Sequence, residues 1–460
     1  MHFVVIVLGD IGRSPRMQYH AVSLLEQGHF VSLVGYDGVD LIPALCNQQE
    51  RLNLVRFTVP SAEKLRKILP LFLIWRVLSL CLYLFYALVV LVPQGSSAPV
   101  DCFLVQNPPA MPLLMIVRLY CHFCLLFQKR QPAMVIDWHN LGFSMLSHPL
   151  FSKVARFYEQ IMAPLATSHL CVTNAMKAFL KTQFQIPEDR ISVLYDCPPN
   201  MFRPLSCEEQ HELLTRLHTT LCTACPSSWY DSLDPTKQTL LTERDPSTGK
   251  CMPRKGRPAL ITSSTSWTTD EDFGILLEAA IALDQQISEA QSRLRVLILV
   301  TGKGPQKDYY LEKISQLKLQ NVAIQTLWLE PVDYPKLLAC ADLGVSLHTS
   351  TSGIDLPMKV LDLFGCGVPV CALDFQCLSE LVVDGTNGKT FATSGQLQKH
   401  LFSLLCPLEN HTTAFPPHGF GDLQQYSQSL EGRKRWDINW KENAYPCLLR
   451  ATGREAYVLD

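Results

Sequence analysis

The chain has 460 residues, 47% of them hydrophobic and 18% charged, with a formal net charge of −2. This composition is that of a globular protein, and the length predicts two domains rather than one. The near-neutral charge leaves no large cationic surface for a polyanion, so we expect no nucleic acid partner.

The first part of the chain, residues 1–204, alternates short apolar segments with amphipathic ones. The apolar segments are about four to eight residues long, as expected for buried parallel strands. Amphipathic stretches such as 17–28 (MQYHAVSLLEQG) lie between them, and Gly28 suits the end of a helix. This alternation predicts an α/β domain with an open parallel sheet. The predicted strands lie at 2–9, 30–36, 101–107, 133–139, 169–174 and 191–196.

Residues 68–92 (ILPLFLIWRVLSLCLYLFYALVVLV) form the longest apolar stretch of this part. A helix of about 20 apolar residues crosses a bilayer core. The stretch contains one charge, Arg76, and follows Lys64, Arg66 and Lys67, a basic flank typical of the cytoplasmic side. Because both flanks belong to one predicted domain, a crossing would divide that domain between two compartments. We therefore predict a helix that dips into or lies on the cytoplasmic leaflet, with a true span and a buried core helix as alternatives.

The cysteines predict a reducing compartment and no metal site. Of the 17 cysteines, most lie singly in apolar segments. The two CxxC pairs, Cys121/Cys124 and Cys222/Cys225, lack His or Cys partners at zinc-site spacing. The chain begins directly with a strand-like segment, so we also expect no signal peptide.

The regular alternation stops at 205–255, where Pro, Ser, Thr, Cys and charged residues are mixed, and we predict an interdomain insertion or linker there. A second alternation over 256–435 predicts a second Rossmann-like domain, and 436–460 holds a short helix and a tail that the pattern does not place. Two such domains predict a central cleft facing the carboxyl ends of both sheets, where open α/β sheets bind ligands. The second set of predicted strands lies at 259–266, 295–302, 322–328, 342–348 and 368–373.

Residues 354–367 (IDLPMKVLDLFGCG) predict a short helix directly after a strand. Pro357 suits the first helical turn, and at about 100° per residue Asp355, Lys359 and Asp362 share one face. One interpretation is a solvated face with an Asp355–Lys359 ion pair. The other is a ligand site, because a helix N-terminus at the end of a strand offers N–H groups to a phosphate. The carboxylates would then bind sugar hydroxyls, and the lysine a phosphate.

The loop 9–16 (GDIGRSPR) follows the first predicted strand. Gly9 and Gly12 allow a tight turn and the close approach of a ligand. Arg13 and Arg16 carry fork-shaped donors that suit a diphosphate. A surface loop with solvated arginines is the alternative.

Two further loops contain candidate ligand-binding groups. Gly302 and Gly304 let backbone N–H groups reach a phosphate or nucleotide, with Lys303 between them. Residues 270–272 (Asp-Glu-Asp) imitate a metal-binding DxD motif, but they precede a predicted helix, where acids complement the helix dipole. We therefore predict no metal at 270–272.

A candidate general base follows the strand at 133–139. His139 stands at the carboxyl end of this strand, at the edge of the predicted cleft. A histidine there can accept the proton of an attacking hydroxyl. Asp137 is predicted either to orient His139 or to be the base itself, and a purely structural histidine is the alternative.

The segments 356–362 (LPMKVLD) and 365–370 (GCGVPV) resemble the sugar-nucleotide motif of glycosyltransferases with the GT-B fold. That motif carries two acids: the second holds the nucleotide ribose, and the first contacts the transferred hexose. The resemblance gives the second role to Asp362. It gives the first to Asp355, which stands one residue closer to Asp362 than the usual spacing.

Six segments together resemble glycosyltransferase family 33, the chitobiosyldiphosphodolichol beta-mannosyltransferases, from residue 1 to about 380. Members usually begin with an N-terminal membrane anchor, whereas this chain starts at the first strand. Either this form lacks the anchor or the segment 68–92 replaces it. The six segments are GDIGRSPRMQYHA, VIDWHNLGFS, CVTNAM, SSTSWTTDEDF, TGKGP and HTSTSGIDLPMKV.

The resemblance implies an inverting transferase that moves mannose from GDP-mannose to dolichyl-diphosphate-linked chitobiose through a β-1,4 linkage. It implies no cofactor and no metal, and it places the enzyme at the endoplasmic reticulum membrane, facing the cytosol. The first domain would bind the acceptor through Gly9, Gly12, Arg13, Arg16 and Asn140, and the second domain would bind the donor. Other transferases that build the lipid-linked oligosaccharide are expected partners.

Two alternatives stay open. The chain is another GT-B transferase for a lipid-linked sugar, with a UDP-sugar as donor, or an inactive paralogue that serves as a membrane-associated partner.

Overall fold

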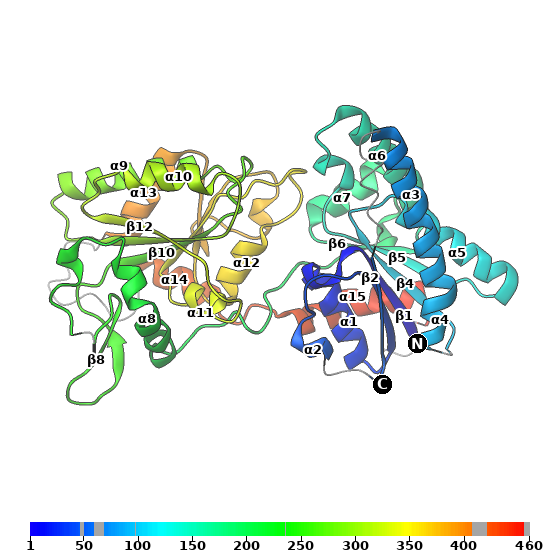
Figure 1. The fold of residues 1–460 in the computed structure, drawn as a ribbon, viewed down its shortest axis with the longest axis horizontal. Coiled ribbons are helices and arrows are strands. Elements are labelled where there is room, and N and C mark those ends of the chain that lie inside the picture. Colours follow the sequence, from blue (N-terminus) through cyan, green and yellow to red (C-terminus); the bar gives the residue numbers. More distant parts are fainter. Residues whose placement is uncertain (47–49, 59–68, 97, 235, 407–420, 455–460) are drawn as a thin grey trace. The chain divides into compact units, whose positions relative to one another are not determined.

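The structure is a computed structural model, and the residues that it describes are 1–46, 50–58, 69–96, 98–234, 236–406 and 421–454 (Figure 1). The chain forms two compact units. The first unit contains Met1–Asp196 together with Trp436–Asp460, and the second contains Cys197–Arg435. The C-terminal segment that the sequence pattern did not place therefore belongs to the first unit.

The first unit is built on a seven-stranded sheet of order β3-β2-β1-β4-β5-β6-β7, with every neighbouring pair parallel. The order reverses direction between β1 and β4, as in doubly wound nucleotide-binding domains. The α/β prediction for this part is confirmed. The strands are β1 His2–Asp10, β2 Phe30–Tyr36, β3 Leu52–Phe57, β4 Cys102–Asn107, β5 Ala133–Trp138, β6 Ser168–Cys171 and β7 Ile191–Val193.

Helices cover this sheet, and the last helix of the chain lies among them. In Figure 1, α15 runs beside α1, although the two are at opposite ends of the sequence. Trp440 of α15 is fully buried there. The helices of this unit are α1 Pro15–Glu26, α2 Pro43–Cys46, α3 Leu69–Tyr86, α4 Val92–Gly95, α5 Leu113–Gln128, α6 Pro149–Met162, α7 Asn174–Gln183 and α15 Trp436–Ala451.

The second unit repeats the design with a six-stranded parallel sheet of order β12-β11-β10-β13-β14-β15. Its order reverses between β10 and β13. Two Rossmann-like units make this a GT-B arrangement, as predicted. The strands are β10 Ala259–Ser264, β11 Val296–Thr301, β12 Val322–Leu327, β13 Leu343–Ser346, β14 Val370–Leu373 and β15 Gly388–Phe391.

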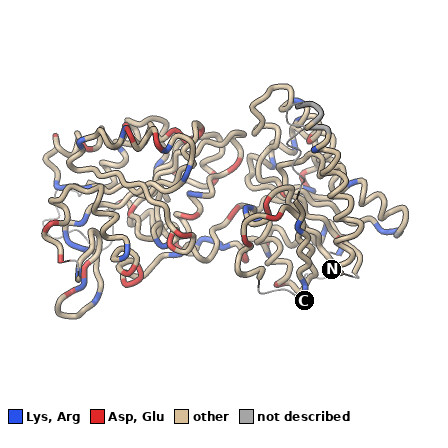
Figure 2. The backbone as a smooth tube through the Cα atoms, in the orientation of Figure 1, with Lys and Arg blue, Asp and Glu red and all other residues tan. Residues whose placement is uncertain are grey.

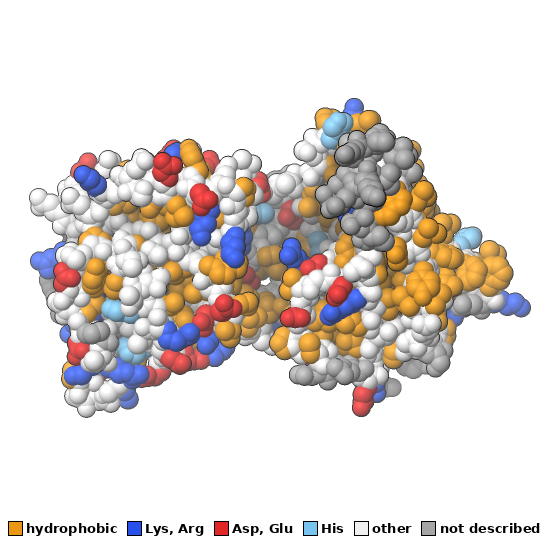
Figure 3. All heavy atoms as spheres, viewed as in Figure 1, with side chains coloured by type: hydrophobic (Ala, Val, Ile, Leu, Met, Phe, Trp, Pro, Cys, Tyr) orange, Lys and Arg blue, Asp and Glu red, His pale blue; other side chains and the backbone are white. Residues whose placement is uncertain are grey.

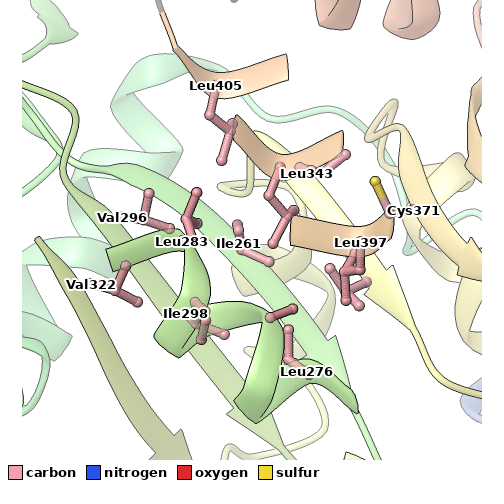
Figure 4. Close-up of a cluster of buried hydrophobic side chains, with 14 of the residues drawn as sticks. Ile261, Leu276, Leu283, Val296, Ile298, Val322, Leu343, Cys371, Leu397 and Leu405 are labelled. Atoms are coloured by element: carbon pink, nitrogen blue, oxygen red, sulfur yellow. The ribbon is translucent and has the colours of Figure 1, made fainter. Parts of the chain in front are cut away.

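The core of the second unit lies between this sheet and helices that include α9 and α13 (Figure 4). Branched side chains of the strands, such as Ile261 and Ile298, meet Leu276 and Leu283 of α9 and Leu397 of α13, all fully buried. The helices of this unit are α8 Cys207–Cys222, α9 Phe273–Glu289, α10 Lys307–Ser315, α11 Tyr334–Leu338, α12 Met358–Gly365, α13 Ser394–Leu405 and α14 Gly421–Ser429.

The segment 205–255 differs from the predicted linker. It holds α8 and a small antiparallel pair, β8 Thr242–Arg244 with β9 Cys251–Pro253. Leu213 and Leu214 of α8 pack against the sheet residues Leu260 and Leu297. The segment is therefore part of the second unit, and its polar composition reflects its outer surface.

Within the described residues, no group of three or more His, Cys, Asp or Glu side chains is arranged to hold a metal ion.

The apolar segment 68–92 forms α3, which continues through a π-helical turn, Ala87–Leu91, into α4; residue 68 lies outside the described part. By length and composition alone, Trp75–Gly95 is long and apolar enough to cross a membrane. Only 28% of its most apolar window is buried. This partial burial disfavours the alternative of a core helix.

Candidate functional site

The candidate site residues lie at the carboxyl edges of the two sheets, and each unit contributes its own set. Open α/β sheets bind ligands outside the carboxyl ends of strands near the point where the strand order reverses. In the second unit these ends are those of β10 and β13. In the first unit they are those of β1, β4 and β5.

In the second unit, α12 begins later than the sequence predicted. Its N-cap is Pro357, and among the described residues no side chain caps it. Val360 N donates to the Pro357 carbonyl oxygen at 3.1 Å, so in the first turn the N–H groups of Met358 and Lys359 stay available among the described residues. Asp355 precedes the helix and accepts hydrogen bonds from Ser350 and, at 3.2 Å, from Ser352. The alternative interpretation, an Asp355–Lys359 ion pair on a solvated helix face, is therefore wrong, because the serine-rich loop binds the Asp355 carboxylate instead.

Lys359 is paired with Glu271, one of the acids in the DxD-like stretch. The same carboxylate accepts from the Ser266 hydroxyl at 2.8 Å and lies 3.5 Å from Nδ1 of His348. Burial would raise the pKa of Glu271, but the bonds from His348, Lys359 and Ser266 hold it well below its ordinary value. The neighbouring Asp272 caps α9 by accepting from Gly274 N, as the sequence predicted for an acid at a helix start.

Asp362 lies on α12 and is largely surrounded by protein. Within the described residues its carboxylate has no hydrogen bond and no ion pair, and burial raises its pKa to about 7. Tyr334 lies nearby, with its hydroxyl bonded to Ser264 Oγ at 3.0 Å. An acceptor group that is desolvated and unpaired gains most from a ligand that supplies hydroxyl donors.

The loop 302–304 has glycine at two positions where neighbouring backbone leaves no room for a side chain. A Cβ atom on Gly302 would lie 1.8 Å from the Thr265 carbonyl oxygen, and one on Gly304 would lie 1.7 Å from that of Ser266. These glycines therefore let two loops of the chain pass close to each other. Lys303 lies over the ring of Trp328, with 3.7 Å from Nζ to the centroid.

In the first unit, Asp137 at the end of β5 is the centre of a buried cluster. Arg16 binds it with two bonds of 2.9 Å, from Nε and Nη2. His20 Nε2 lies 3.2 Å and His139 Nε2 lies 2.7 Å from its Oδ2 atom. Burial alone would raise the pKa of Asp137, but Arg16 and the two histidines hold it well below its ordinary value. Asp137 has an exposed fraction of 0%, so its carboxylate is placed to hold the groups that surround it.

The C-terminal helix sets the protonation of His20. Trp440 Nε1–H donates to His20 Nδ1 at 2.8 Å, so the ring proton of the neutral histidine is on Nε2 and points at Asp137. Burial lowers the pKa of His20, which favours this neutral form.

His139 is the member of the cluster that reaches solvent, since its side chain is 23% exposed. With Nε2–H donated to Asp137, its Nδ1 atom carries a lone pair, and no described residue binds that atom. This is the orientation of a general base held by a carboxylate.

Glu159 on the inner face of α6 supports the loop after His139. Its Oε1 atom accepts from Gly142 N at 3.0 Å and from the Asn107 side chain at 3.3 Å. Burial raises the pKa of Glu159 to about 7. Asn140 lies in the same loop, and its Oδ1 atom accepts from Leu141 N at 2.7 Å.

The predicted diphosphate loop separates into exposed and buried parts. Arg13 is 78% exposed beside Asp10, so it can reach a ligand. Arg16 is buried and bound to Asp137 and Asp196, so its predicted role as a free diphosphate donor is wrong. A Cβ atom on Gly12 would lie 2.2 Å from the Val39 carbonyl oxygen, whereas Gly9 meets no close neighbour.

Sequence reasoning did not find the partners of these residues. Glu271 was assigned to the helix start, and His20 and Glu159 are isolated in apolar surroundings of the sequence. Trp440 is separated from His20 by most of the chain. One feature of the sequence could have indicated these partners. His20 and Glu159 are polar residues in predicted helices that also contain apolar residues, and a polar group that is buried in a protein needs a hydrogen-bond partner.

Comparisons with known proteins identify the family. Residues 258–406 match the family model "Glycosyl transferases group 1". The chain is 40% identical to "UDP-glycosyltransferase TURAN" of Arabidopsis thaliana, over 98% of each chain. It is 39% identical to a "Chitobiosyldiphosphodolichol beta-mannosyltransferase" of Mus musculus, over 97% of this chain and 89% of that one. The protein of the same name in Homo sapiens is 37% identical, over 97% and 92%.

Solved structures agree on the fold. A glycosyltransferase from Rickettsia africae matches with a TM-score of 0.62 at 13% identity, over 98% of each chain. Anabaena Alr3699/HepE in complex with UDP matches with a TM-score of 0.56 at 14% identity, over 100% of this chain and 99% of that one. Together with the near-full-length relatives, these matches show that the chain belongs to the chitobiosyldiphosphodolichol beta-mannosyltransferase family of GT-B glycosyltransferases.

Proposed function

We propose that this protein transfers mannose from GDP-mannose to dolichyl-diphosphate-linked chitobiose, with inversion at the anomeric carbon and a β-1,4 linkage in the product. The acceptor follows the names of the relatives. The His139–Asp137 pair is the observation that supports this reaction, because an inverting transfer needs one base that takes the proton of the attacking hydroxyl.

In this mechanism His139 Nδ1 takes the proton of the acceptor hydroxyl. The hydroxyl oxygen attacks the anomeric carbon from the side opposite the leaving group, and the bond from that carbon to the phosphate oxygen breaks. Its electron pair leaves with GDP, so the α-linked donor gives a β-linked product. Asp137 holds the imidazole and stabilises the imidazolium that forms.

The second unit would bind the donor. Asp362 would accept from the ribose hydroxyls, and Asp355 would face the hexose. The first turn of α12 and Lys359 would meet the diphosphate charge, in exchange for the present bond from Lys359 to Glu271. Gly302, Lys303 and Gly304 stay candidates for the nucleotide edge. The proposal needs no cofactor and assigns no metal.

The first unit would bind the acceptor through the exposed Arg13 and the loops that contain Gly9, Gly12 and Asn140. A dolichol chain costs about 0.8 kcal/mol for each CH₂ group exposed to water, so the acceptor should stay in the bilayer. The partly exposed α3 supports a location at a membrane. We propose that this is the endoplasmic reticulum membrane, with both units in the cytosol. Other transferases of the lipid-linked oligosaccharide are proposed partners there.

The pKa of Asp362 predicts a pH-dependent donor affinity. Because the pKa is raised to about 7, the carboxyl is mostly protonated below pH 7 and ionises as the pH rises through that value. The ionised form accepts both ribose hydroxyls, so we expect the KM for GDP-mannose to fall about tenfold between pH 6 and pH 8. Asp362→Asn should raise KM and remove this dependence. A wild-type KM that is constant over this range would contradict the role of Asp362.

A UDP-sugar is the second candidate donor, because the Arabidopsis relative is named a UDP-glycosyltransferase. The test is a donor panel with the purified protein in phospholipid vesicles that contain the chitobiose lipid. We expect transfer from GDP-mannose only. Transfer from a UDP-sugar instead would move the proposal to that donor, and no transfer from any donor would favour the inactive paralogue.

A further inference from the structure

Two cysteines of the second unit are in contact, although 44 positions of the sequence separate them. Cys207 is the first residue of α8 and Cys251 is the first residue of β9, and their Sγ atoms lie 2.8 Å apart. Both are free thiols, and both are partly exposed, whereas most of the other cysteines are buried. Two thiols in contact need only a small side-chain movement to form a disulfide.

Other contacts hold the backbone on both sides of this thiol pair. Glu208 Oε1 accepts a hydrogen bond from Cys251 N at 3.1 Å, and Glu208 Oε2 lies 2.8 Å from the Arg244 guanidinium of β8. One turn further along α8, His211 Nδ1 lies 2.8 Å from Thr242 Oγ1. These bonds join α8 to the β8–β9 pair without a covalent link. A disulfide would therefore form on a frame that already has the required arrangement.

The thiol pair lies at a polar part of the second unit. In Figure 2 the tubes of α8 and β8 carry both red and blue. Figure 3 shows charged side chains of both signs over these two elements on the face shown. A small, water-soluble oxidant can approach such a surface, whereas it does not reach a thiol in the apolar core.

The two thiols differ in how readily they lose a proton. Burial raises the pKa of Cys207, and the nearby Glu208 adds to the rise, while a bond from Cys251 and the charges of Arg244 and Arg257 oppose it. Burial and the neighbouring Cys207 sulfur both raise the pKa of Cys251. Because the thiolate is the nucleophile in disulfide exchange, Cys207 is the thiol that attacks first.

We propose that Cys207 and Cys251 form a reversible disulfide with a low-molecular-weight disulfide, such as glutathione disulfide, as the oxidant. The Cys207 thiolate attacks one sulfur of glutathione disulfide, the S–S bond of the oxidant breaks, and one glutathione leaves. Cys251 then loses its proton and attacks the Cys207 sulfur, which releases the second glutathione. The two protein thiols lose two electrons and two protons, and glutathione disulfide gains them as two glutathione molecules. An excess of glutathione reverses both steps.

The disulfide would close a covalent ring over residues 207–251. This ring contains α8, which packs on the sheet of the second unit through Leu213 and Leu214. A ring of this length restricts the unfolded chain much more than the folded one, so the oxidised form resists unfolding. The oxidation state of the pair would thus set the stability of the second unit.

The first test identifies the bond. The full chain is incubated with glutathione disulfide, its remaining thiols are alkylated, and its peptides are analysed by mass spectrometry without reduction. We expect the Cys207 and Cys251 peptides to be joined, two hydrogen atoms lighter than their sum, and to separate with dithiothreitol. The exposed Cys46 is the control, and we expect it to carry glutathione only. Cys207 and Cys251 that stay reduced, that carry glutathione only or that pair with other cysteines would overturn the proposal.

The second test measures the effect of the ring on stability. We expect oxidation to raise the Tm of the second unit by at least about 5 °C in the wild type and to leave it unchanged in Cys251→Ser. The matched control is Cys406→Ser, which replaces another partly exposed cysteine of this unit, and it should respond to oxidation as the wild type does. Equal shifts in Cys251→Ser and in the wild type would show that another cysteine causes the effect. A wild-type Tm that oxidation does not change would contradict the role of the ring.

Discussion

Replacing Asp137 with alanine is expected to lower the free energy of unfolding by about 3–5 kcal/mol and to abolish transfer. The substitution leaves the buried guanidinium of Arg16 with one carboxylate, Asp196, in place of two. It also removes the acceptor that holds His20 and His139. Urea denaturation followed by circular dichroism measures the first effect, and mannose transfer measures the second.

The matched control for this experiment is Asp333→Ala. Asp333 also binds an arginine with two bonds, at 2.9 and 2.8 Å, but that arginine, Arg216, is 51% exposed. We expect a loss of less than about 1 kcal/mol, since solvent screens such pairs. If both variants lost the same free energy of unfolding, the burial of the Asp137 cluster would not determine how much that cluster stabilises the fold.

The second large effect is expected for His139→Ala, with kcat lower by about 10²–10⁴ and little change in the KM for the donor. The reason is that His139 acts only on the proton of the acceptor hydroxyl. The fold should persist, because Asp137 keeps Arg16 and His20 as partners. Initial rates at saturating donor and acceptor measure the effect.

His400→Ala is the matched control. His400 is a partly buried histidine of α13 with one bond of 3.2 Å to the Thr390 carbonyl oxygen. We expect its kcat to equal that of the wild type. A His139→Ala enzyme with wild-type kcat would exclude His139 as the base.

The central strands of both sheets could be predicted from the sequence, and so could the edge strands β7 and β12, whereas the edge strands β3 and β15 could not. Central parallel strands are buried on both faces and read as continuous apolar segments, as β4 and β11 do. At the edges, β3 and β15 mix polar and apolar residues because one side faces water. The helix α8 was missed for a similar reason, since its outer face is polar and one side packs on the sheet.

Individual residues of the candidate site could be predicted from the sequence, but the residues that they contact could not. Asp137 and His139 stand at the carboxyl end of a predicted strand, and Asp362 stands on a predicted helix that follows another strand. The α/β fold gathers ligand groups at such strand ends. The partners of these groups come from distant segments, as with Arg16 and Asp137 or Trp440 and His20. Such contacts follow from tertiary packing, which local patterns do not contain.

Lys359 illustrates the limit most clearly. Helical spacing favoured Asp355 as its partner, but the helix begins at Met358, so Asp355 is outside the helical geometry. Glu271, from the loop before α9, takes that place. The sequence identified the lysine correctly as a charged group of the helix, and the fold supplied its partner.

The anomeric configuration of the product shows whether transfer proceeds with inversion. The purified protein, in vesicles with dolichyl-diphosphate chitobiose, receives GDP-mannose with a labelled sugar, and the released glycan is treated with anomer-specific mannosidases. We expect a labelled trisaccharide that β-mannosidase cleaves and α-mannosidase does not, and we expect that the His139→Ala enzyme does not form it. An α-linked product, or equal product from His139→Ala, would contradict inversion assisted by the His139–Asp137 pair.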